Sequence, residues 1–214
     1  MNKKDLKATA IIVAHPDDET LWAGGTILCH PSWKWFILCL CRGSDNDRAD
    51  KFLKTLEILG AEGIIGDLDD GPEQKPLDEN ELTHTILKLL PSMHFDLIIS
   101  HNPNGEYTRH ARHEETGRAV IKLWHEGKIS ANKLWVFAYE DGGKKYYPRP
   151  VETATVFRKL TEQIWLKKYS IITETYGFEK TSFEAKTTPR AESFWQFTDP
   201  DDAEQWLNNG EVLV

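Results

Sequence analysis

Short apolar runs alternate along the chain with segments in which apolar residues recur every three or four positions. The runs of strand length are Ala8–Ala14, Trp35–Cys41, Phe95–Ser100 and Leu134–Tyr139. Strands that alternate with helices favour a parallel sheet, because parallel neighbours need a crossover connection and are buried on both faces. We therefore predict an α/β fold with a mainly parallel sheet.

Two of the intervening segments predict helices with clear ends. In Asp50–Leu59 the apolar residues lie on one helical face, and Gly60 follows where a left-handed residue ends many helices. Glu79–Leu90 repeats the pattern, with Asp78 as the N-cap and Pro91 as the stop signal. Both segments are therefore expected to be crossover helices.

The last third of the chain has a weaker pattern. We expect a strand over Ala154–Leu160, followed by a helix that Thr161 caps and that runs toward Tyr176. The turn-rich stretches Gly66–Pro76 and Asp141–Pro150 predict long surface loops, which often carry function in α/β folds.

Composition and charge exclude several classes of protein. A chain of 214 residues with 40% hydrophobic and 11% aromatic residues is typical of one globular domain and not of a disordered protein. The formal net charge of −8 argues against a nucleic-acid partner. No apolar run approaches the roughly 20 residues of a membrane span, and the first residues lack the pattern of a signal peptide. We therefore expect a cytoplasmic protein with no membrane span.

The first predicted strand ends in a cluster of titratable residues, His15-Pro16-Asp17-Asp18-Glu19. Carboxylates this close raise one another's pKa unless a cation compensates, and open α/β sheets bind ligands at the carboxyl ends of their strands. Acidic residues also cap helices and interact favourably with the helix dipole, which explains Glu19 well. Capping explains less well why a histidine stands at the strand exit beside two aspartates, so we favour a metal site.

A second cluster follows Phe95–Ser100 and contains His101, His110 and His113. On a helix, His110 and His113 would lie about 60° apart and face one pocket, although H-x-x-H alone is weak support. Both clusters follow core strands, so a parallel sheet would bring them to one edge, where His and Asp ligands can converge on one ion. Two imidazoles and one carboxylate leave a position for water, as in hydrolytic zinc sites. His101, at a strand end, is interpreted either as a residue that supports the ligands from behind or as a structural residue.

Together these motifs resemble the PIG-L/LmbE-like family of zinc-dependent N-deacetylases. The motifs that carry the resemblance are A-H-P-D-D-E, G-E-Y, H-x-x-H, Gly24-Gly25, Asp69-Asp70-Gly71 and Glu192-Ser193-Phe194. The resemblance implies a single Rossmann-like domain over residues 1–214, with helices on both faces of the sheet. It also implies one zinc ion (Zn2+) per chain, with Fe2+ as an alternative because iron can occupy similar ligand sets.

Carried over residue by residue, the family pattern implies that His15, Asp18 and His113 hold the metal. It implies that Asp17 is the general base toward the metal-bound water and that His110 opposes the leaving group or the oxyanion. Zinc suits these roles, because it can lower the pKa of bound water from about 15.7 toward about 7.

The resemblance further implies that Arg48, Asp69 and Asp70 contact a polar, hydroxyl-rich ligand, and the position of Tyr107 suggests a sugar contact. Each has an ordinary structural explanation as well. Arg48 is also typical of a solvated helix start, Asp69-Asp70 of a turn, and an aromatic residue of core packing.

The chain departs from the family pattern in two places. Many members have Asp immediately before the second histidine of H-x-x-H, and here that residue is Arg112. We expect this cation to lower the pKa of His110 and weaken its role as an acid, unless Glu106, Glu114 or Asp141 compensates. There is also one residue more between the tyrosine of G-E-Y and the first histidine than in the relatives that the chain most resembles.

The expected activity is removal of the acetyl group from an N-acetylglucosamine-type amino sugar in a small-molecule conjugate. One alternative is a zinc amidase that acts on a bulkier acyl or thiol conjugate in a wider pocket. Another is a metal-containing carbohydrate-binding protein whose altered second motif has cost it turnover. The sequence leaves open whether the protein is a homo-oligomer.

Overall fold

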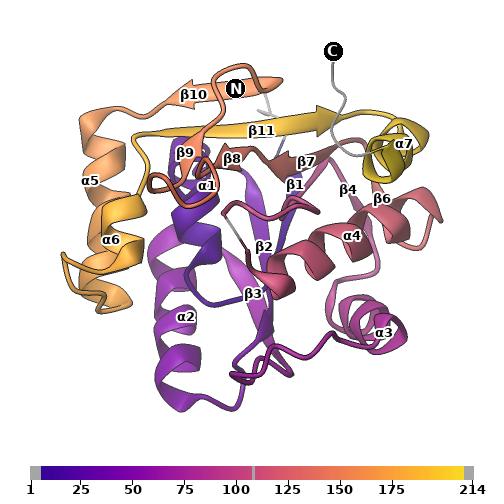
Figure 1. Ribbon diagram of the computed structural model, residues 1–214, viewed down its shortest axis with the longest axis horizontal. Helices are drawn as coiled ribbons and strands as arrows, with labels where there is room; N and C mark the ends of the chain where they lie inside the picture. The colour runs from indigo at the N-terminus through magenta and orange to yellow at the C-terminus, as the bar shows by residue number, and fades with distance from the viewer. Residues whose placement is uncertain (1–5, 108, 210–214) are drawn as a thin grey trace.

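The computed structural model describes residues 6–107 and 109–209, and a seven-stranded sheet runs through its centre (Figure 1). The strand order is β10-β11-β7-β5-β1-β2-β3. The strands are β1 (Ala8–Val13), β2 (Lys34–Cys41), β3 (Glu62–Leu68), β5 (Leu97–Ser100), β7 (Leu134–Phe137), β10 (Val156–Lys159) and β11 (Ala191–Phe197). Neighbours from β7 to β3 are parallel, while β11 is antiparallel to β7 and β10. The predicted α/β fold with a mainly parallel sheet is confirmed.

Helices cover both faces of this sheet, as predicted (Figure 1). One face carries α1 (Asp18–Cys29), α2 (Asn46–Leu59) and α5 (Glu162–Ser170). The other face carries α3 (Glu79–Leu89), α4 (Ala111–His125) and α7 (Pro200–Asn209). Successive side chains of the central strands alternate between the faces, so each helical layer packs on a buried apolar core of its own.

Smaller elements complete the described chain. Two short strand pairs are β4 (His94–Phe95) with β6 (Ser130–Ala131) and β8 (Tyr139–Glu140) with β9 (Arg149–Pro150). The predicted helix toward Tyr176 is α5 continued by a π-helical turn over Ile171–Thr175, and α6 spans Phe183–Thr187.

The predicted starts of two helices, α3 and α5, agree with the structure because the expected N-cap side chains are in place. Asp78 caps α3 by accepting the main-chain N–H of Glu81, and Thr161 caps α5 by accepting that of Ile164. These two caps confirm the predicted starts.

The start of α2 differs from its prediction. The helix begins at Asn46 and not at Asp50, because Asp45 accepts the main-chain N–H of Arg48 and so adds a turn. Its end is as predicted, with Gly60 in the left-handed region at φ 65°.

The edge strand β3 was not predicted, because exposed and buried residues are mixed along it and no apolar run marks it. Two glycines allow it to lie close to β2. A Cβ at Gly63 would lie 2.4 Å from the carbonyl oxygen of Ile37, and one at Gly66 would lie 2.9 Å from that of Leu40. The close approach of the two backbones therefore helps to place this strand, together with the packing of Leu68 in one apolar core and of Ile65 against the other.

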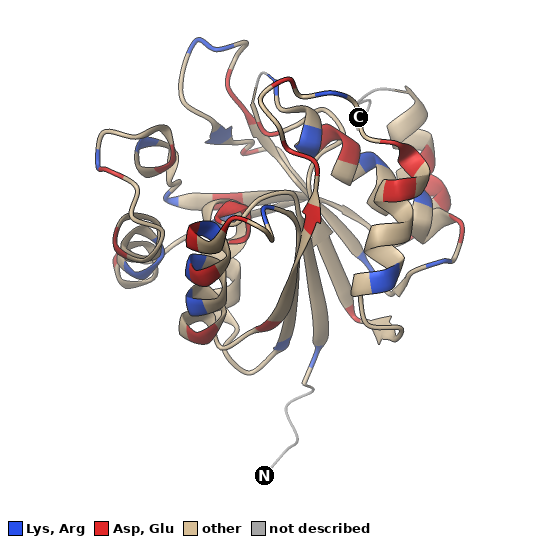
Figure 2. Cartoon of the chain, turned by 90° about the horizontal axis from the view of Figure 1, so that it is seen from below, with Lys and Arg blue, Asp and Glu red and all other residues tan. Residues whose placement is uncertain are grey.

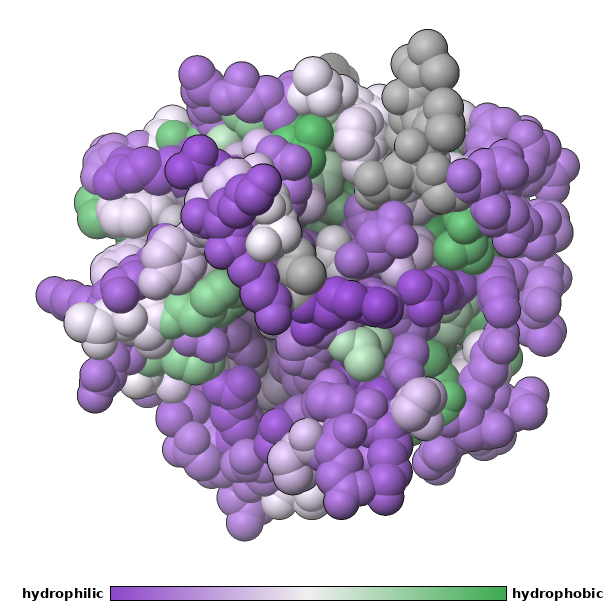
Figure 3. Space-filling view, in the orientation of Figure 1, coloured by the Kyte–Doolittle hydropathy of each residue, from purple (hydrophilic) through white to green (hydrophobic). Residues whose placement is uncertain are grey.

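The face of the molecule seen in Figure 3 is mainly hydrophilic, and its apolar residues form small separate groups. Basic and acidic residues are interleaved on the helices in Figure 2. Within the described residues, no helix is both long enough and apolar enough to cross a bilayer.

Candidate metal centre

The two clusters found in the sequence meet at the carboxyl ends of β1 and β5. These strands are parallel neighbours with Ile12 beside Ser100, so the loops that follow them leave the same edge of the sheet. The first loop carries His15 into α1, and the second runs from His101 into α4. The predicted convergence of the two clusters is therefore confirmed.

Three atoms of metal-ligand type lie at nearly equal distances from one another. Nδ1 of His15 is 3.2 Å from Oδ2 of Asp18, and Nε2 of His113 is 3.3 Å from each of these atoms. A tetrahedral zinc ion with bonds of about 2.0–2.1 Å separates its ligand atoms by about 3.3–3.4 Å. All three side chains are buried. Their spacing and chemistry therefore fit one divalent ion.

Asp18 is held in this position from two sides. Its Oδ1 accepts a hydrogen bond from Nε1 of Trp22 at 3.1 Å, and its Oδ2 accepts the main-chain N–H of His15 at 2.9 Å. Burial raises the pKa of Asp18, but His113 and His101 outweigh this effect and lower the pKa well below its usual value. The carboxylate is therefore ionised, as a metal ligand must be.

Asp17 lies beside the three atoms without joining them. Its φ is 113°, in a region that residues other than glycine rarely adopt, and its side chain makes no capping hydrogen bond. Glu19 holds this turn, because Oε2 accepts the main-chain N–H of Asp17 at 3.1 Å and Oε1 accepts the hydroxyl of Tyr176 at 2.8 Å. Glu19 thus stabilises the start of α1, and the side chain of Asp17 lines the cavity beside the three atoms.

Arg48 contacts Asp17, with Nη2 lying 3.3 Å from Oδ1 of the carboxylate. Burial and Asp18 raise the pKa of Asp17, Arg48 lowers it, and the resulting pKa lies well above the usual value. The guanidinium of Arg48 also lies over the ring of Phe178, with a centroid distance of 5.2 Å. Arg48 therefore lines the cavity, and its ion-pair partner within the protein is Asp17, the candidate base.

Glu106, which was considered only as a compensating partner for His110, instead contacts His113 and His101. Its Oε2 lies 2.6 Å from Nδ1 of His113 and 3.0 Å from Nδ1 of His101, and its side chain is completely buried. Burial raises the pKa of Glu106, but the two histidines outweigh it and lower the pKa to about 2. The G-E-Y motif was the available signal, since a carboxylate is a common partner of a metal-binding histidine.

His101 belongs to the layer behind the ligands. It forms a second metal-type cluster with Asp18 and His113. However, Nε2 of His101 accepts the main-chain N–H of Ala14 at 3.0 Å, so its lone pair is already engaged. The interpretation of His101 as a structural residue therefore agrees with its hydrogen bonds.

His110 stacks on His113 with ring centroids 4.3 Å apart and approaches His15 at 4.6 Å. Its Nδ1 is buried and has no hydrogen-bond partner among the described residues. Burial, together with His113 and His15, lowers the pKa of His110 to about 3. The expected lowering is present, and the imidazole is neutral near pH 7.

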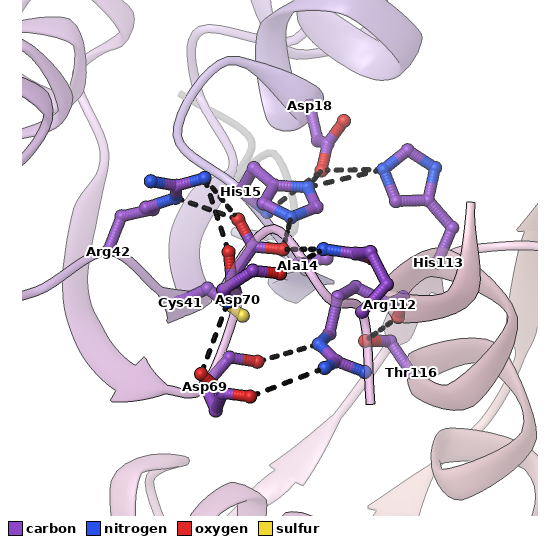
Figure 4. A network of polar contacts seen from close by, with 12 residues as sticks. Ala14, His15, Asp18, Cys41, Arg42, Asp69, Asp70, Arg112, His113 and Thr116 are labelled. Carbon is purple, nitrogen blue, oxygen red and sulfur yellow. Dashed lines mark hydrogen bonds and ion pairs between the residues drawn. The ribbon is translucent and has the colours of Figure 1, made fainter. Parts of the chain in front are cut away.

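The cause expected for this lowering was wrong, because Arg112 does not face the cavity. Its Nε donates to the carbonyl oxygen of Asp69 at 2.7 Å, and its Nη2 donates to that of Lys75 at 2.6 Å. Figure 4 shows the guanidinium beside Asp69, turned away from the ring of His113. Arg112 therefore binds a loop and leaves the electrostatics of the imidazoles to their own neighbours.

A cavity of about 150 Å³ lies beside the three atoms, and three of the four residues expected to contact the substrate line it. Arg48, Asp70 and Tyr107 are among its lining residues, whereas Asp69 is not among the described residues that line it. A second cavity of about 390 Å³ adjoins the first, and the two share Tyr107 and Phe183.

Several solved structures are similar to this fold, among them the following three. The first is 4-carboxy-2-hydroxymuconate hydratase GalB from Pseudomonas putida KT2440, with a TM-score of 0.59 and 18% identity, covering 90% of this chain and 97% of that chain. The second is the A40926 pseudoaglycone deacetylase Dbv21, with a TM-score of 0.59 and 13% identity, covering 91% of this chain and 98% of that chain. The third is a zinc-inhibited form of teicoplanin deacetylase Orf2, with a TM-score of 0.54 and 14% identity, covering 79% of this chain and 83% of that chain. At these identities the likeness concerns the fold.

Two further comparisons concern the sequence. The uncharacterized protein L374 of Acanthamoeba polyphaga mimivirus is 23% identical over 178 residues, which cover 76% of this chain and 75% of that protein. The family model for GlcNAc-PI de-N-acetylase, PIG-L, matches residues 10–124, more than half of the chain. The chain with this cluster of histidines and carboxylates therefore belongs to the PIG-L family, as the resemblance of its motifs implied.

Proposed function

We propose that this chain is a metal-dependent N-deacetylase that removes the acetyl group from an N-acetylglucosamine-type amino sugar in a small conjugate. The observation that carries the proposal is the triangle formed by Nδ1 of His15, Oδ2 of Asp18 and Nε2 of His113, with sides of 3.2–3.3 Å. Membership of the PIG-L family supports deacetylation as the reaction. Zinc is the ion that this ligand set favours, and Fe2+ is the alternative.

A bound zinc ion would supply the chemistry of water activation and carbonyl polarisation. Asp17 is the candidate for the general base, because its carboxylate lines the cavity and lies outside the ligand triangle. Its pKa is raised by burial and by Asp18, which suits a carboxylate that takes a proton from water and returns it to the departing amine. The ion pair with Arg48 holds this carboxylate in place.

His110 is the candidate for stabilising the charge that develops on the carbonyl oxygen of the substrate. Its ring lines the cavity, and its buried Nδ1 has no partner among the residues that the structure describes. Since its pKa is lowered to about 3, the ring acts as a neutral N–H donor and not as the protonated imidazole first expected. Removing one such donor typically costs about 10²–10³-fold in rate.

The two adjoining cavities suit a substrate with two parts. The inner cavity of about 150 Å³ has room for the acetamido end, and the outer one of about 390 Å³ would take the remainder of the conjugate. The outer wall includes Tyr107, Tyr146 and Tyr147, whose flat faces suit a sugar ring or an apolar group. The outer cavity is also large enough for a bulkier acyl group, so an amide of that kind is the second candidate substrate.

Acetate release by zinc-loaded protein tests the proposal. The panel contains N-acetylglucosamine, its small conjugates and N-acyl analogues with longer chains, each followed for the freed amine and the freed acid. Acetate from the N-acetyl conjugates is the expected result. Turnover restricted to the longer acyl groups would favour the amidase, and binding without turnover would favour a carbohydrate-binding protein.

A further inference from the structure

The first turn of α4 holds the loop that follows β3 by its main chain. Arg112 donates from Nε to the carbonyl oxygen of Asp69 at 2.7 Å and from Nη2 to that of Lys75 at 2.6 Å. Glu115 accepts the main-chain N–H of Leu77 at 3.1 Å and also binds Nη1 of Arg112. Two neighbouring side chains of one helix therefore bind three main-chain groups of the loop 69–77.

This loop places Asp70 against the far side of a candidate metal ligand. Oδ1 of Asp70 lies 3.3 Å from Nε2 of His15, at ion-pair distance although not aligned as a hydrogen bond. The carboxylate is itself held by Arg42, whose Nε donates to Oδ2 at 2.7 Å, and by Gln74, whose Nε2 donates to Oδ1 at 2.9 Å. Histidines that bind a metal through one nitrogen usually have such a carboxylate on the other nitrogen.

These contacts connect Arg112 to both candidate histidine ligands (Figure 4). Arg112 binds the loop at Asp69, and the next residue of the loop, Asp70, lies against Nε2 of His15. Nδ1 of His15 lies 3.3 Å from Nε2 of His113, which is the next residue to Arg112 on α4. The side chain that departs from the family pattern thus links the two halves of the centre.

The burial of Arg112 is difficult to explain by packing alone. Its side chain is 1% exposed, and burying a guanidinium is costly unless its donors are satisfied. All three of its nitrogens have partners, and two of them bind carbonyl oxygens of the loop. An apolar residue would fill the same space without fixing where the loop lies.

We propose that Arg112 is a positioning residue for the metal centre, which acts by holding the loop 69–77 so that Asp70 orients the imidazole of His15. This inference rests on the metal site of the proposed function. It gives Asp70 a role within the protein in place of the expected contact with the ligand. It also means that the departure from the family pattern supports the centre and does not impair it.

The test is the affinity of metal-free protein for cobalt(II), followed by visible absorption and by competition with a chelator. Arg112→Met should bind cobalt about 10–100-fold more weakly than the unsubstituted protein, the usual effect of losing the support of a ligand. Arg118→Met is the matched control, because Arg118 lies on the same helix and binds Pro103 and Glu114 but not this loop. It should bind cobalt as the unsubstituted protein does.

A double-mutant cycle separates this role from a general effect on folding. In an Asp70→Ala background, Arg112→Met should cause less than about a twofold further loss, since its route to His15 is already broken. An equal loss in both backgrounds would overturn the proposal, as would unchanged affinity in either single variant. If Arg112→Met does not fold, Arg112→Lys enters the same cycle with the same criteria, because it keeps the cation but cannot bridge both carbonyls.

The outcomes also separate this inference from the proposed function. Unsubstituted protein that binds no cobalt would contradict the metal site itself. Tight binding by the unsubstituted protein, with no loss in Arg112→Met or Asp70→Ala, would contradict only the role of Arg112.

Discussion

Nδ1 of His113 lies 2.6 Å from Oε2 of the buried Glu106. Because the two ring nitrogens point in different directions, this contact leaves Nε2 facing His15 and Asp18. Glu106 binds His101 through the same oxygen, so one carboxylate orients both rings at the end of β5. The geometry of the candidate ligands therefore depends on a residue that does not join them.

Glu106→Gln tests this dependence through the pH dependence of stability in metal-free protein. The folded-state pKa of Glu106 is about 2 against an ordinary 4.5, so its stabilisation is present above about pH 4.5 and is lost as the pH falls toward 2. The shift corresponds to roughly 3 kcal/mol. Urea unfolding at pH 7 and pH 3 should show a smaller loss for Glu106→Gln than for the unsubstituted protein. Glu57→Gln, at an exposed position on α2, is the control, and equal pH dependence in all three would refute the assignment.

Asp17→Asn and His113→Ala should separate catalysis from metal binding. Asp17 lies outside the ligand triangle, so Asp17→Asn should retain zinc while turnover falls by about 10²–10⁴-fold. His113→Ala removes one corner of the triangle, so zinc affinity itself should fall. Elemental analysis after dialysis and acetate release are the two measurements. Full activity in Asp17→Asn would show that another group acts as the base.

Gly117→Ala should displace α4, the helix that carries His113, and so weaken the candidate metal site. An added Cβ would lie 2.5 Å from the carbonyl oxygen of His101, so the helix that carries His113 must move away from the loop. We expect a loss of about 1–3 kcal/mol in the free energy of unfolding, together with weaker cobalt binding. Gly24→Ala, where the nearest atom is a methyl group at 3.3 Å, is the control and should change neither strongly. Calorimetry and cobalt titration of both variants would decide, and wild-type values for Gly117→Ala would contradict this account.

Lys168→Met should destabilise the fold without affecting metal binding. Lys168 and Glu192 form a completely buried ion pair at 2.6 Å, and Glu192 also accepts the main-chain N–H groups of Gly25 and Thr26. Removing one partner leaves a buried charge, at a cost of about 3–5 kcal/mol. Urea denaturation is the measurement, and Lys167→Met, at the exposed neighbouring position, is the control. Equal stability of the two variants would mean that the ion pair contributes little.

Four of the predicted strands come from apolar runs that report burial on both faces, as in Ala8–Ala14 and Trp35–Cys41. Among the sheet strands without such a run, β10 was predicted over Ala154–Leu160 and is found at Val156–Lys159, whereas β3 and β11 were not predicted. β3 is an edge strand with alternating exposure, and β11 mixes buried polar residues such as Glu192 and Ser193 with apolar ones. Their placement depends on neighbouring strands distant in the chain, which local periodicity does not reveal.

The candidate ligands were predictable for a related reason. His15 and Asp18 lie within one turn at a strand exit, whereas the helical spacing expected for His110 and His113 holds only in part, because α4 begins at Ala111 and His110 is its extended N-cap residue. Short-range geometry of the backbone determines both arrangements. Because β1 and β5 are parallel, the same topology brings both segments to one edge of the sheet.

By itself, the sequence determined the fold class, the edge of the sheet that carries the chemistry and the residues that meet there. Only the tertiary structure decided what those side chains do to one another. In the folded protein, Nε2 of His101 accepts a main-chain N–H and Arg112 binds a carbonyl oxygen of the loop after β3. The groups packed around His110 lower its pKa, so that its ring is neutral near pH 7. These outcomes depend on the direction of each side chain and on the groups packed around it. The spacing of residues along the chain indicates which of them lie on the same face of a helix or strand. It does not indicate which side chain or main-chain group each buried residue contacts.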